Sequence, residues 1–250
     1  MAPQREPEDR GGARGRRSPL GGLPRRVDAG GSPELEGPQC GGRGVKAELL
    51  SFTPLGELRK VAPDGLPDEG LLPHLTYVFA IEGISRACSH QLVRHRTASY
   101  SQQSQRYIPV RRLRERVVIP PSVSEKALNE YMSLMDRASD AYGGLVDTGV
   151  PREDARFVLP NAAETSLLFT IDGRSLLHFF GIRCCNRAQW EIRALADRML
   201  AEVRGEEPAI FGRAGPNCYW LGYCPEGRFT CGRMDEVVES YRDPGLGVVE

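Results

Sequence analysis

Lysine is nearly absent from this chain, although its overall charge is balanced. All but three of its 33 basic residues are arginines, and 33 acidic residues offset them. A net charge of zero provides no overall field that would draw the protein to nucleic acid or to anionic membranes. No apolar run approaches the roughly 20 residues needed to cross a bilayer, and no apolar signal core is present. These absences favour a cytoplasmic protein that contacts neither membranes nor nucleic acid.

The cysteines give no clear sign of disulfides or metal. Their number is seven, which is odd, and adjacent Cys184 and Cys185 are poorly placed to pair with each other. We therefore expect reduced thiols, as in a cytoplasmic protein. Cys218, Cys224 and Cys231 are spaced widely and unevenly with no histidine nearby, so the zinc signal is weak and we expect no metal site.

Acidic residues are also missing from residues 94–107, which read Arg-His-Arg-Thr-Ala-Ser-Tyr-Ser-Gln-Gln-Ser-Gln-Arg-Tyr. A buried segment would not tolerate unpaired guanidinium groups, and a merely solvated face would carry mixed charge. Arginines interleaved with hydroxyl donors suit a phosphate group. The stretch predicts a nucleotide-phosphate site.

The composition divides the chain into a central domain and two terminal segments. Residues 1–44 are rich in Gly, Pro and Arg and have almost no large apolar side chains. We expect disorder there, or a start codon assigned too early with Val45 as the true initiator; an RNA-binding arm is the functional alternative. Residues 45–240 form the expected domain, and 241–250 form a short tail.

Hydrophobic periodicity predicts strands over 46–52, 74–82 and 165–171. Prolines and glycines predict a loop over 54–73, and Gly83 is expected to close the second strand. Helices are predicted over 85–93 with Ser85 as cap, over 172–182 with Asp172 as cap, over 186–203 with Asn186 as cap, and over 152–159. A capping box of Ser122 and Glu125 predicts a long amphipathic helix ending at Gly143-Gly144.

This order of elements predicts an α+β fold, with a small antiparallel or mixed sheet packed with long helices. No Gly-rich strand-to-helix turn marks a Rossmann nucleotide site. Residues 94–107 are expected to continue from a helix end as a polar loop.

Arg94-His95-Arg96, followed after seven residues by Ser104, resembles the signature of the flavin-dependent (alternative) thymidylate synthases. The resemblance extends over about 74–203 and the first strand. Further blocks that resemble the family are Ile84–Val93, Ala155–Asn161, Arg174–Phe180 and Arg183–Arg193.

The resemblance implies a homotetramer whose active sites lie between subunits. It implies FAD as cofactor, with NADPH and 5,10-methylenetetrahydrofolate as co-substrates, and conversion of dUMP to dTMP without attack by a cysteine. The cofactor carries the difficult chemistry, and the protein supplies orientation and charge.

The resemblance also implies roles for individual residues. Arg183 matches the family's catalytic arginine, which stabilises the N3-ionised uracil. The residues implied to bind dUMP are Gln91, Arg94, Gln102, Gln103, Ser104, Gln105, Arg106, Arg156 and Arg183. Those implied to bind FAD are Arg94, His95, Arg96, Gln102, Asp172, Arg174, His178 and Arg187.

Structural alternatives remain for three of these residues. Arg183 could only complement a helix dipole, His178 could be a core histidine, and Arg156 could be an ordinary surface arginine. Family members usually have further helices in the interval that 54–73 fills here. A truncated homologue that binds dUMP with little or no turnover is therefore the alternative function. A nucleic-acid-binding protein using Arg111, Arg112, Arg114 and Arg116 is a further one.

Overall fold

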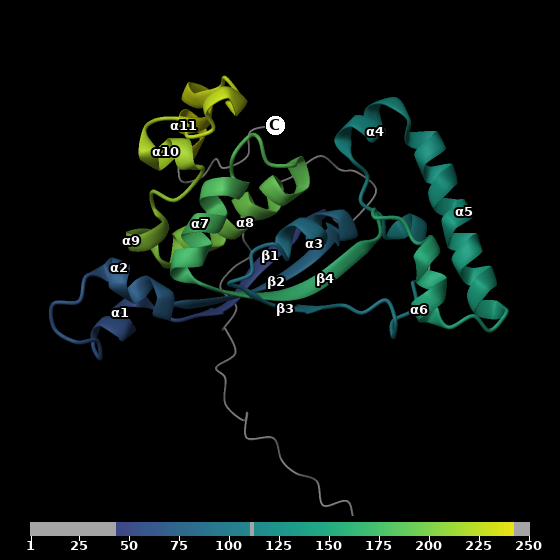
Figure 1. Cartoon of the computed structure of the whole chain (residues 1–250), viewed down its shortest axis with the longest axis horizontal. Coiled ribbons are helices and arrows are strands. Elements are labelled where there is room, and N and C mark those ends of the chain that lie inside the picture. The colour runs from purple at the N-terminus through teal and green to yellow at the C-terminus, as the bar shows by residue number, and fades with distance from the viewer. Residues whose placement is uncertain (1–43, 111–112, 243–250) are drawn as a thin grey trace, which may run out of the picture. The chain divides into compact units, whose positions relative to one another are not determined.

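The computed structural model describes residues 44–110 and 113–242, so the expectations for 1–43 and for the tail beyond 242 lie outside the described residues. A four-stranded antiparallel sheet runs through the described chain in the order β1-β2-β4-β3 (Figure 1). Its strands are β1 Lys46–Phe52, β2 Thr76–Ser85, β3 Ser99–Gln102 and β4 Glu164–Asp172. The predicted α+β class is confirmed, and the sheet is antiparallel rather than mixed.

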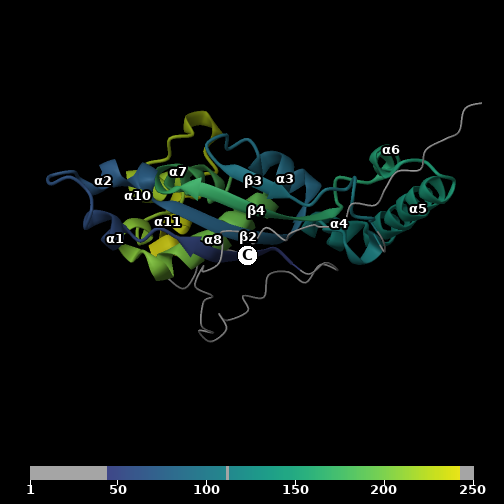
Figure 2. The ribbon, with the colours of Figure 1, turned by 90° about the horizontal axis from the view of Figure 1, so that it is seen from below.

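Two helices, α7 Gly173–Arg183 and α8 Trp190–Glu206, lie on one face of the sheet (Figure 1). Turned by 90°, Figure 2 shows the strands from below with these helices behind them. The predicted alternation in β2 is confirmed, because Tyr77, Phe79 and Ile81 are fully buried. Phe79 packs on Phe169 of β4, and the aromatic residues of α7 complete this core.

The helix caps show which local signals decided the fold. Ser85 caps α3 Arg86–Leu92, because its Oγ accepts from the Cys88 N–H at 2.9 Å. Asp172 caps α7 in the same way through the Ser175 N–H. The predicted Asn186 cap of α8 is wrong. Gln189 caps that helix by accepting from two backbone N–H groups, while the Asn186 Oδ1 accepts from Arg193.

Gly83 does not close β2, which continues to Ser85. The glycine has φ of 70° and falls where the pairing register with β4 shifts between Ile81 and Ile84. A Cβ at this position would collide with the carbonyl oxygen of Gly44. Gly83 therefore forms a bulge inside the strand. The position requires glycine, because its backbone is left-handed and the Gly44 carbonyl approaches it closely.

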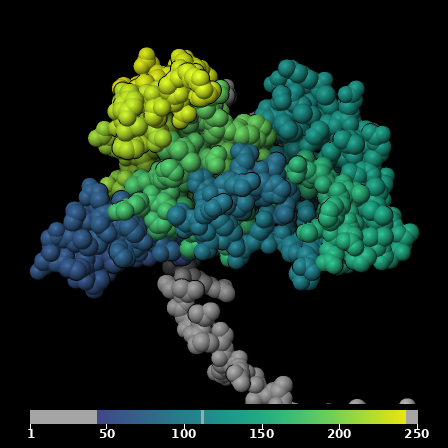
Figure 3. All heavy atoms as spheres, viewed as in Figure 1, coloured from purple at the N-terminus to yellow at the C-terminus, as the bar shows by residue number. Residues whose placement is uncertain are grey.

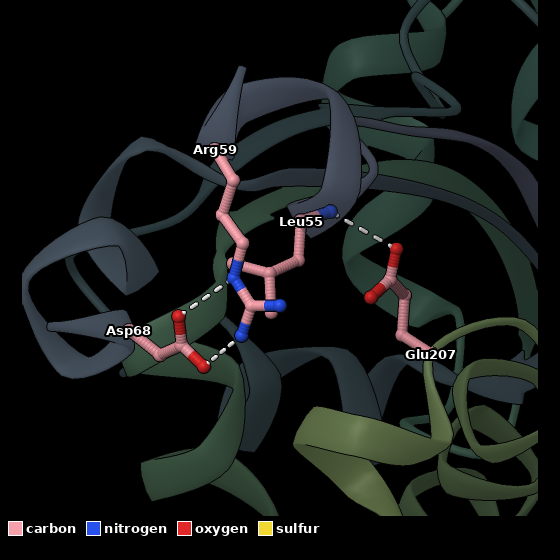
Figure 4. A network of polar contacts seen from close by, with 4 residues as sticks. All are labelled: Leu55, Arg59, Asp68 and Glu207. Carbon is pink, nitrogen blue, oxygen red and sulfur yellow. Dashed lines mark hydrogen bonds and ion pairs between the residues drawn. The ribbon is translucent and has the colours of Figure 1, made fainter. Parts of the chain in front are cut away.

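The predicted loop over 54–73 instead contains α1 Leu55–Arg59, α2 Asp68–Leu71 and the 3₁₀ turn η1 Leu72–His74. Pro54 and Pro67 occupy the N-cap positions of α1 and α2, so they begin helices rather than break them. The Leu55 N–H donates to the buried Glu207 carboxylate at 3.1 Å, and Arg59 pairs with Asp68 (Figure 4). The first bond fixes the segment to the domain, and the second joins α1 to α2 within the segment.

The predicted long helix is interrupted. It consists of α4 Pro121–Lys126 and α5 Leu128–Asp147, separated by Ala127 in a non-helical conformation. Ser122 lies inside α4, which starts after Pro120 with no side-chain cap, so the capping box is not formed. Gly143 and Gly144 lie within α5. The helix packs against a second small core with the turn η2 Leu113–Glu115, and α6 Arg152–Ala155 and η3 Arg156–Val158 follow it.

The C-terminal segment contains α9 Pro208–Phe211, α10 Asn217–Leu221, the turn η4 Gly227–Phe229 and α11 Met234–Arg242. Tyr241 belongs to the core, because its buried hydroxyl contacts the Cys184 carbonyl and the Asp197 carboxylate. The last helix thus runs past residue 240. Within the described chain, none of the helices has the length and apolar character that a membrane span requires.

The burial of Asp197 predicts a pH-dependent stability, which the hydrogen bond from Tyr241 only partly offsets. Burial raises the pKa of Asp197 from its usual 3.8 to about 6. The contribution of this carboxyl to the free energy of unfolding is therefore largest below its unfolded pKa and is lost as pH rises through about 6. Asp197→Asn, which resembles the protonated form, removes up to about 3 kcal/mol of this pH dependence. Urea unfolding of both proteins across this range measures the difference, and parallel curves would contradict the assignment.

Candidate active site

Two segments distant in the sequence meet at a direct contact between Arg183 and His95. Arg183 is the last residue of α7, and its Nε donates to the His95 Nε2 at 3.0 Å. His95 follows the end of α3, is buried, and packs edge-on against Phe179 with ring centroids 4.9 Å apart. The Tyr100 hydroxyl of β3 lies 2.9 Å from the His95 carbonyl oxygen and fixes the turn.

The electrostatics of this contact keep the histidine neutral. Burial and the nearby charges of Arg183 and His178 lower the pKa of His95 to about 4. A neutral Nε2 can accept from the arginine, which requires the proton to sit on Nδ1. Burial also lowers the pKa of Arg183, yet a guanidinium remains charged in any working range. Arg183 is thus a half-buried cation whose terminal amino groups can bind an anion.

Other predicted residues lie around this contact. Gln91 is half-buried and approaches the Gln189 cap of α8, with its Nε2 3.5 Å from the Gln189 Oε1. Arg94 and Arg96 flank His95 and are exposed. No hydrogen bond or ion pair engages their guanidinium groups within the described part of the chain. They are cations with free donors at the end of α3.

The predicted polar loop over 94–107 contains the edge strand β3, which corrects that expectation. Backbone pairing with β4 explains it, because Ser99 opposes Thr170 and Gln102 opposes Leu167. The Gln102 Nε2 donates to the Thr165 Oγ1 at 3.1 Å, and the Gln103 N–H donates to the Ser166 carbonyl at 2.9 Å. The sheet therefore holds the glutamines of the motif in a fixed register.

A shallow pocket opens where this segment leaves the sheet. Gln103, Ser104 and Gln105 line it, and Arg116, Glu164 and Thr165 contribute the opposite wall. The Glu164 Oε1 is buried, and in the described chain it has no hydrogen-bond partner. Such an acceptor is a candidate ligand contact. Glu164 was not predicted, because nothing in its local sequence distinguishes it from a strand-end carboxylate.

Three arginines gather beside the start of α6. Arg106 pairs with Glu153 through its Nε at 2.9 Å and an Nη at 2.7 Å, and the Arg156 Nε donates to the Glu153 carbonyl at 3.1 Å. Burial and the charge of Arg156 lower the pKa of half-buried Arg86. Two neighbouring guanidinium groups favour an anion between them. Arg86 was also missed, although it stands directly after the Ser85 cap in the arginine-rich run.

The remaining predicted residues are placed differently. The Asp172 carboxylate caps α7, and an Arg174 Nη donates to the Glu69 carbonyl at 2.8 Å. These two residues lie at the opposite end of α7 from Arg183, about 14 to 16 Å away at 1.5 Å per residue. His178 is exposed, so it is no core histidine, but it lies close enough to affect His95. Arg187 is exposed beyond α7.

The two described arginines of the nucleic-acid alternative are engaged within the domain. Arg114 pairs with Asp136, and Arg116 lines the pocket. Arg111 and Arg112 lie outside the described residues. The described part of this run therefore supports an internal site better than a nucleic-acid surface.

Comparison with known proteins places these residues in context. The model of the family described as Thymidylate synthase complementing protein matches residues 65–209. The flavin-dependent thymidylate synthase of Geobacter sulfurreducens is 57% identical over 183 residues, which cover 72% of this chain and 78% of that protein. That of Thermococcus onnurineus is 45% identical over 192 residues, covering 73% and 78%. Thymidylate synthase X from Helicobacter pylori, solved with FAD and dUMP, aligns with a TM-score of 0.54 at 25% identity, covering 67% of this chain and 97% of that chain.

The neutral state of His95 can be measured directly. NMR of the imidazole nitrogens is expected to show His95 titrating at about 4. Arg183→Met removes one neighbouring charge, so the pKa of His95 should rise while remaining below the usual value because burial persists. The His178→Gln variant tests the smaller contribution in the same way. Titration of His95 near its usual value in the unaltered protein would contradict this arrangement.

Proposed function

Because this chain belongs to the flavin-dependent thymidylate synthase family, we propose that it converts dUMP to dTMP, with 5,10-methylenetetrahydrofolate as carbon donor and NADPH as reductant. The observation that carries the proposal is the Arg183–His95 contact within the family's arginine-rich motif. The proposed setting is cytoplasmic.

Arg183 has the properties needed to bind the reacting pyrimidine. Its Nε is held by neutral His95, which leaves the terminal amino groups to donate to a uracil carbonyl or to the ionised N3. The half-buried cation favours the anionic ring and lowers the pKa of the ring N–H. Negative charge on the ring makes its C5 carbon a better nucleophile toward the one-carbon donor.

The three arginines beside α6 suit the phosphate of dUMP. Arg156 and Arg86 provide neighbouring positive charges, and Ser104 adds a hydroxyl donor from the pocket. Arg106 currently pairs with exposed Glu153, and a phosphate dianion can replace that carboxylate with stronger hydrogen bonds. We therefore add Arg86 to the phosphate-binding residues, beside the glutamines Gln102, Gln103 and Gln105.

The residues present also fit FAD. Arg94 and Arg96 are exposed, have free donors and flank a neutral histidine, which suits a cofactor with an anionic pyrophosphate. His178 lies near this group. Asp172 and Arg174 would approach the cofactor from the other end of α7, and Arg187 would approach it from beyond the last residue of that helix. The flavin, when bound, supplies the hydride chemistry that no side chain of this chain can perform.

The surface around the arginines supports the proposal of a homotetramer whose active sites are shared between subunits. Tyr107 and Ile108 next to Arg106, and Phe157 and Val158 next to Arg156, are exposed, with Phe157 84% accessible. Clustered exposed apolar side chains of this kind mark surfaces that a partner covers. A second subunit placed there would enclose the arginine group and separate it from water.

The alternative of a truncated, poorly active homologue is not favoured. The segment 54–73 is folded and is bonded to buried Glu207. The chain also covers 97% of the Helicobacter pylori structure. We propose that the enzyme retains flavin binding and turnover.

Substitution of Arg183 tests the mechanism. Arg183→Ala is expected to reduce dTMP formation by at least about a hundredfold, because the pyrimidine anion loses its counter-charge. Oxidation of NADPH by bound FAD should be largely retained. Product formation and NADPH absorbance measure the two steps, and Arg213→Ala, an exposed arginine of the C-terminal segment, is the matched control. Turnover near the original level would exclude the role assigned to Arg183.

Substitution at the phosphate group should act on binding. Arg156→Ala and Arg86→Ala are each expected to raise the KM for dUMP by about 10- to 100-fold, as the loss of a charged hydrogen bond predicts. The kcat should change less, because these residues do not contact the ring. The effect should be absent with deoxyuridine, which has no phosphate. Equal effects on dUMP and deoxyuridine would place these arginines elsewhere.

A further inference from the structure

In the segment between α10 and α11, only the cysteines are partly buried against the rest of the protein. Of residues 222–233, all are exposed except Cys224 and Cys231, which are half-buried. The large side chains of this segment, Tyr223 and Phe229, face solvent. Apart from the short turn η4, its backbone is irregular. Cys224 packs against the main hydrophobic core, so the segment is attached to the domain surface through its cysteines and not through its large side chains.

These two thiols face two others from distant parts of the chain. Cys218 is buried in α10, and Cys185 follows the last residue of α7 by two positions. The helix α10 packs against both α7 and α11, and Figure 3 shows the C-terminal segment in yellow resting on the green helices. Burial raises the pKa of the Cys218 thiol, and the nearby thiols of Cys185, Cys224 and Cys231 raise it further. Four cysteine sulfurs therefore lie within electrostatic range of one another.

Cysteine sulfurs are ligands that a soft cation prefers. All four cysteines are free of disulfides. Burial raises the pKa of the Cys185 thiol, and the backbone N–H of Arg187, which donates to its sulfur, offsets part of that effect. Arg233 lies close enough to Cys231 to interact with it electrostatically. Zinc binds four cysteine sulfurs in a closed tetrahedral site. Arg233 would offset part of the remaining negative charge, to which Glu226 near Cys185 adds.

We propose that Cys185, Cys218, Cys224 and Cys231 bind one zinc ion, which attaches the C-terminal segment to the end of α7. In the described chain, no three side chains of ligand type are already arranged to hold a metal, so binding must draw the sulfurs together. Gly222, Gly227 and Gly232 have positive φ angles and give the segment the backbone freedom to close. The sequence alone predicted no metal site, because Cys218, Cys224 and Cys231 give only a weak signal and Cys185 lies 33 positions before Cys218.

Metal analysis of the full-length enzyme tests the proposal. Protein produced with zinc in the medium and purified under reducing conditions is expected to carry about one zinc per chain. Replacement by cobalt should give the thiolate charge-transfer and tetrahedral ligand-field absorption of a four-sulfur site. Cys224→Ser and Cys231→Ser should each weaken zinc affinity by at least about tenfold. Cys184→Ala is the control, because this buried neighbour of Cys185 contacts Asp197 instead and should leave zinc binding unchanged.

A second measurement keeps the test valid if a variant is unstable. In the unaltered enzyme, chelation should expose the four thiols to a thiol reagent and open the segment to trypsin after Arg228 and Arg233. Absence of zinc from the reduced enzyme after exposure to excess zinc, or disulfides among these four cysteines in peptide maps, would overturn the proposal. Zinc content is measured without dUMP turnover, so this result is independent of the proposed catalytic function.

Discussion

The active site depends on a cation held by a neutral histidine. If His95 were protonated, it would repel Arg183, and the guanidinium would lose both its acceptor and its orientation. Burial against Phe179 prevents this by lowering the pKa of His95. The aromatic core of α7 therefore does more than stabilise the fold. It sets the protonation state that allows a second cationic group to stand beside the imidazole.

A buried carboxylate fixes the corner from which the site is built. Glu191, in the first turn of α8, is 2% exposed and accepts from the Ser85 N–H and Oγ, each at 2.6 Å. These two bonds offset much of the penalty of burying the charge, although burial still raises the pKa of Glu191. They hold the junction of β2 and α3. The position of Arg86, and of His95 beyond the end of α3, follows from that junction.

The sequence predicted features whose cause is local. The alternation of β2 and the caps Ser85 and Asp172 were correct because each depends on neighbouring residues. The capping box at Ser122 failed, since Pro120 occupies the N-cap and the helix starts at Pro121, two positions earlier than a serine cap at 122 allows.

Contacts between distant segments could not be predicted from pattern alone. Glu164 and Arg86 acquire their importance from partners or pockets formed by other elements. The arginine-rich motif was predictable because its composition is unusual within a short window. The role of Cys185 was not, because its proposed co-ligands come from another helix and an irregular segment.

The hydroxyl of Tyr241 reaches the carbonyl of Cys184, one residue beyond Arg183. Through this hydrogen bond α11, the final described helix, supports the last turn of α7. An enzyme cleaved within α11 would keep every residue proposed to bind substrate. It would nevertheless lose the contact that supports the last turn of α7, so cleavage near the carboxyl end would disturb the position of Arg183, the proposed catalytic residue.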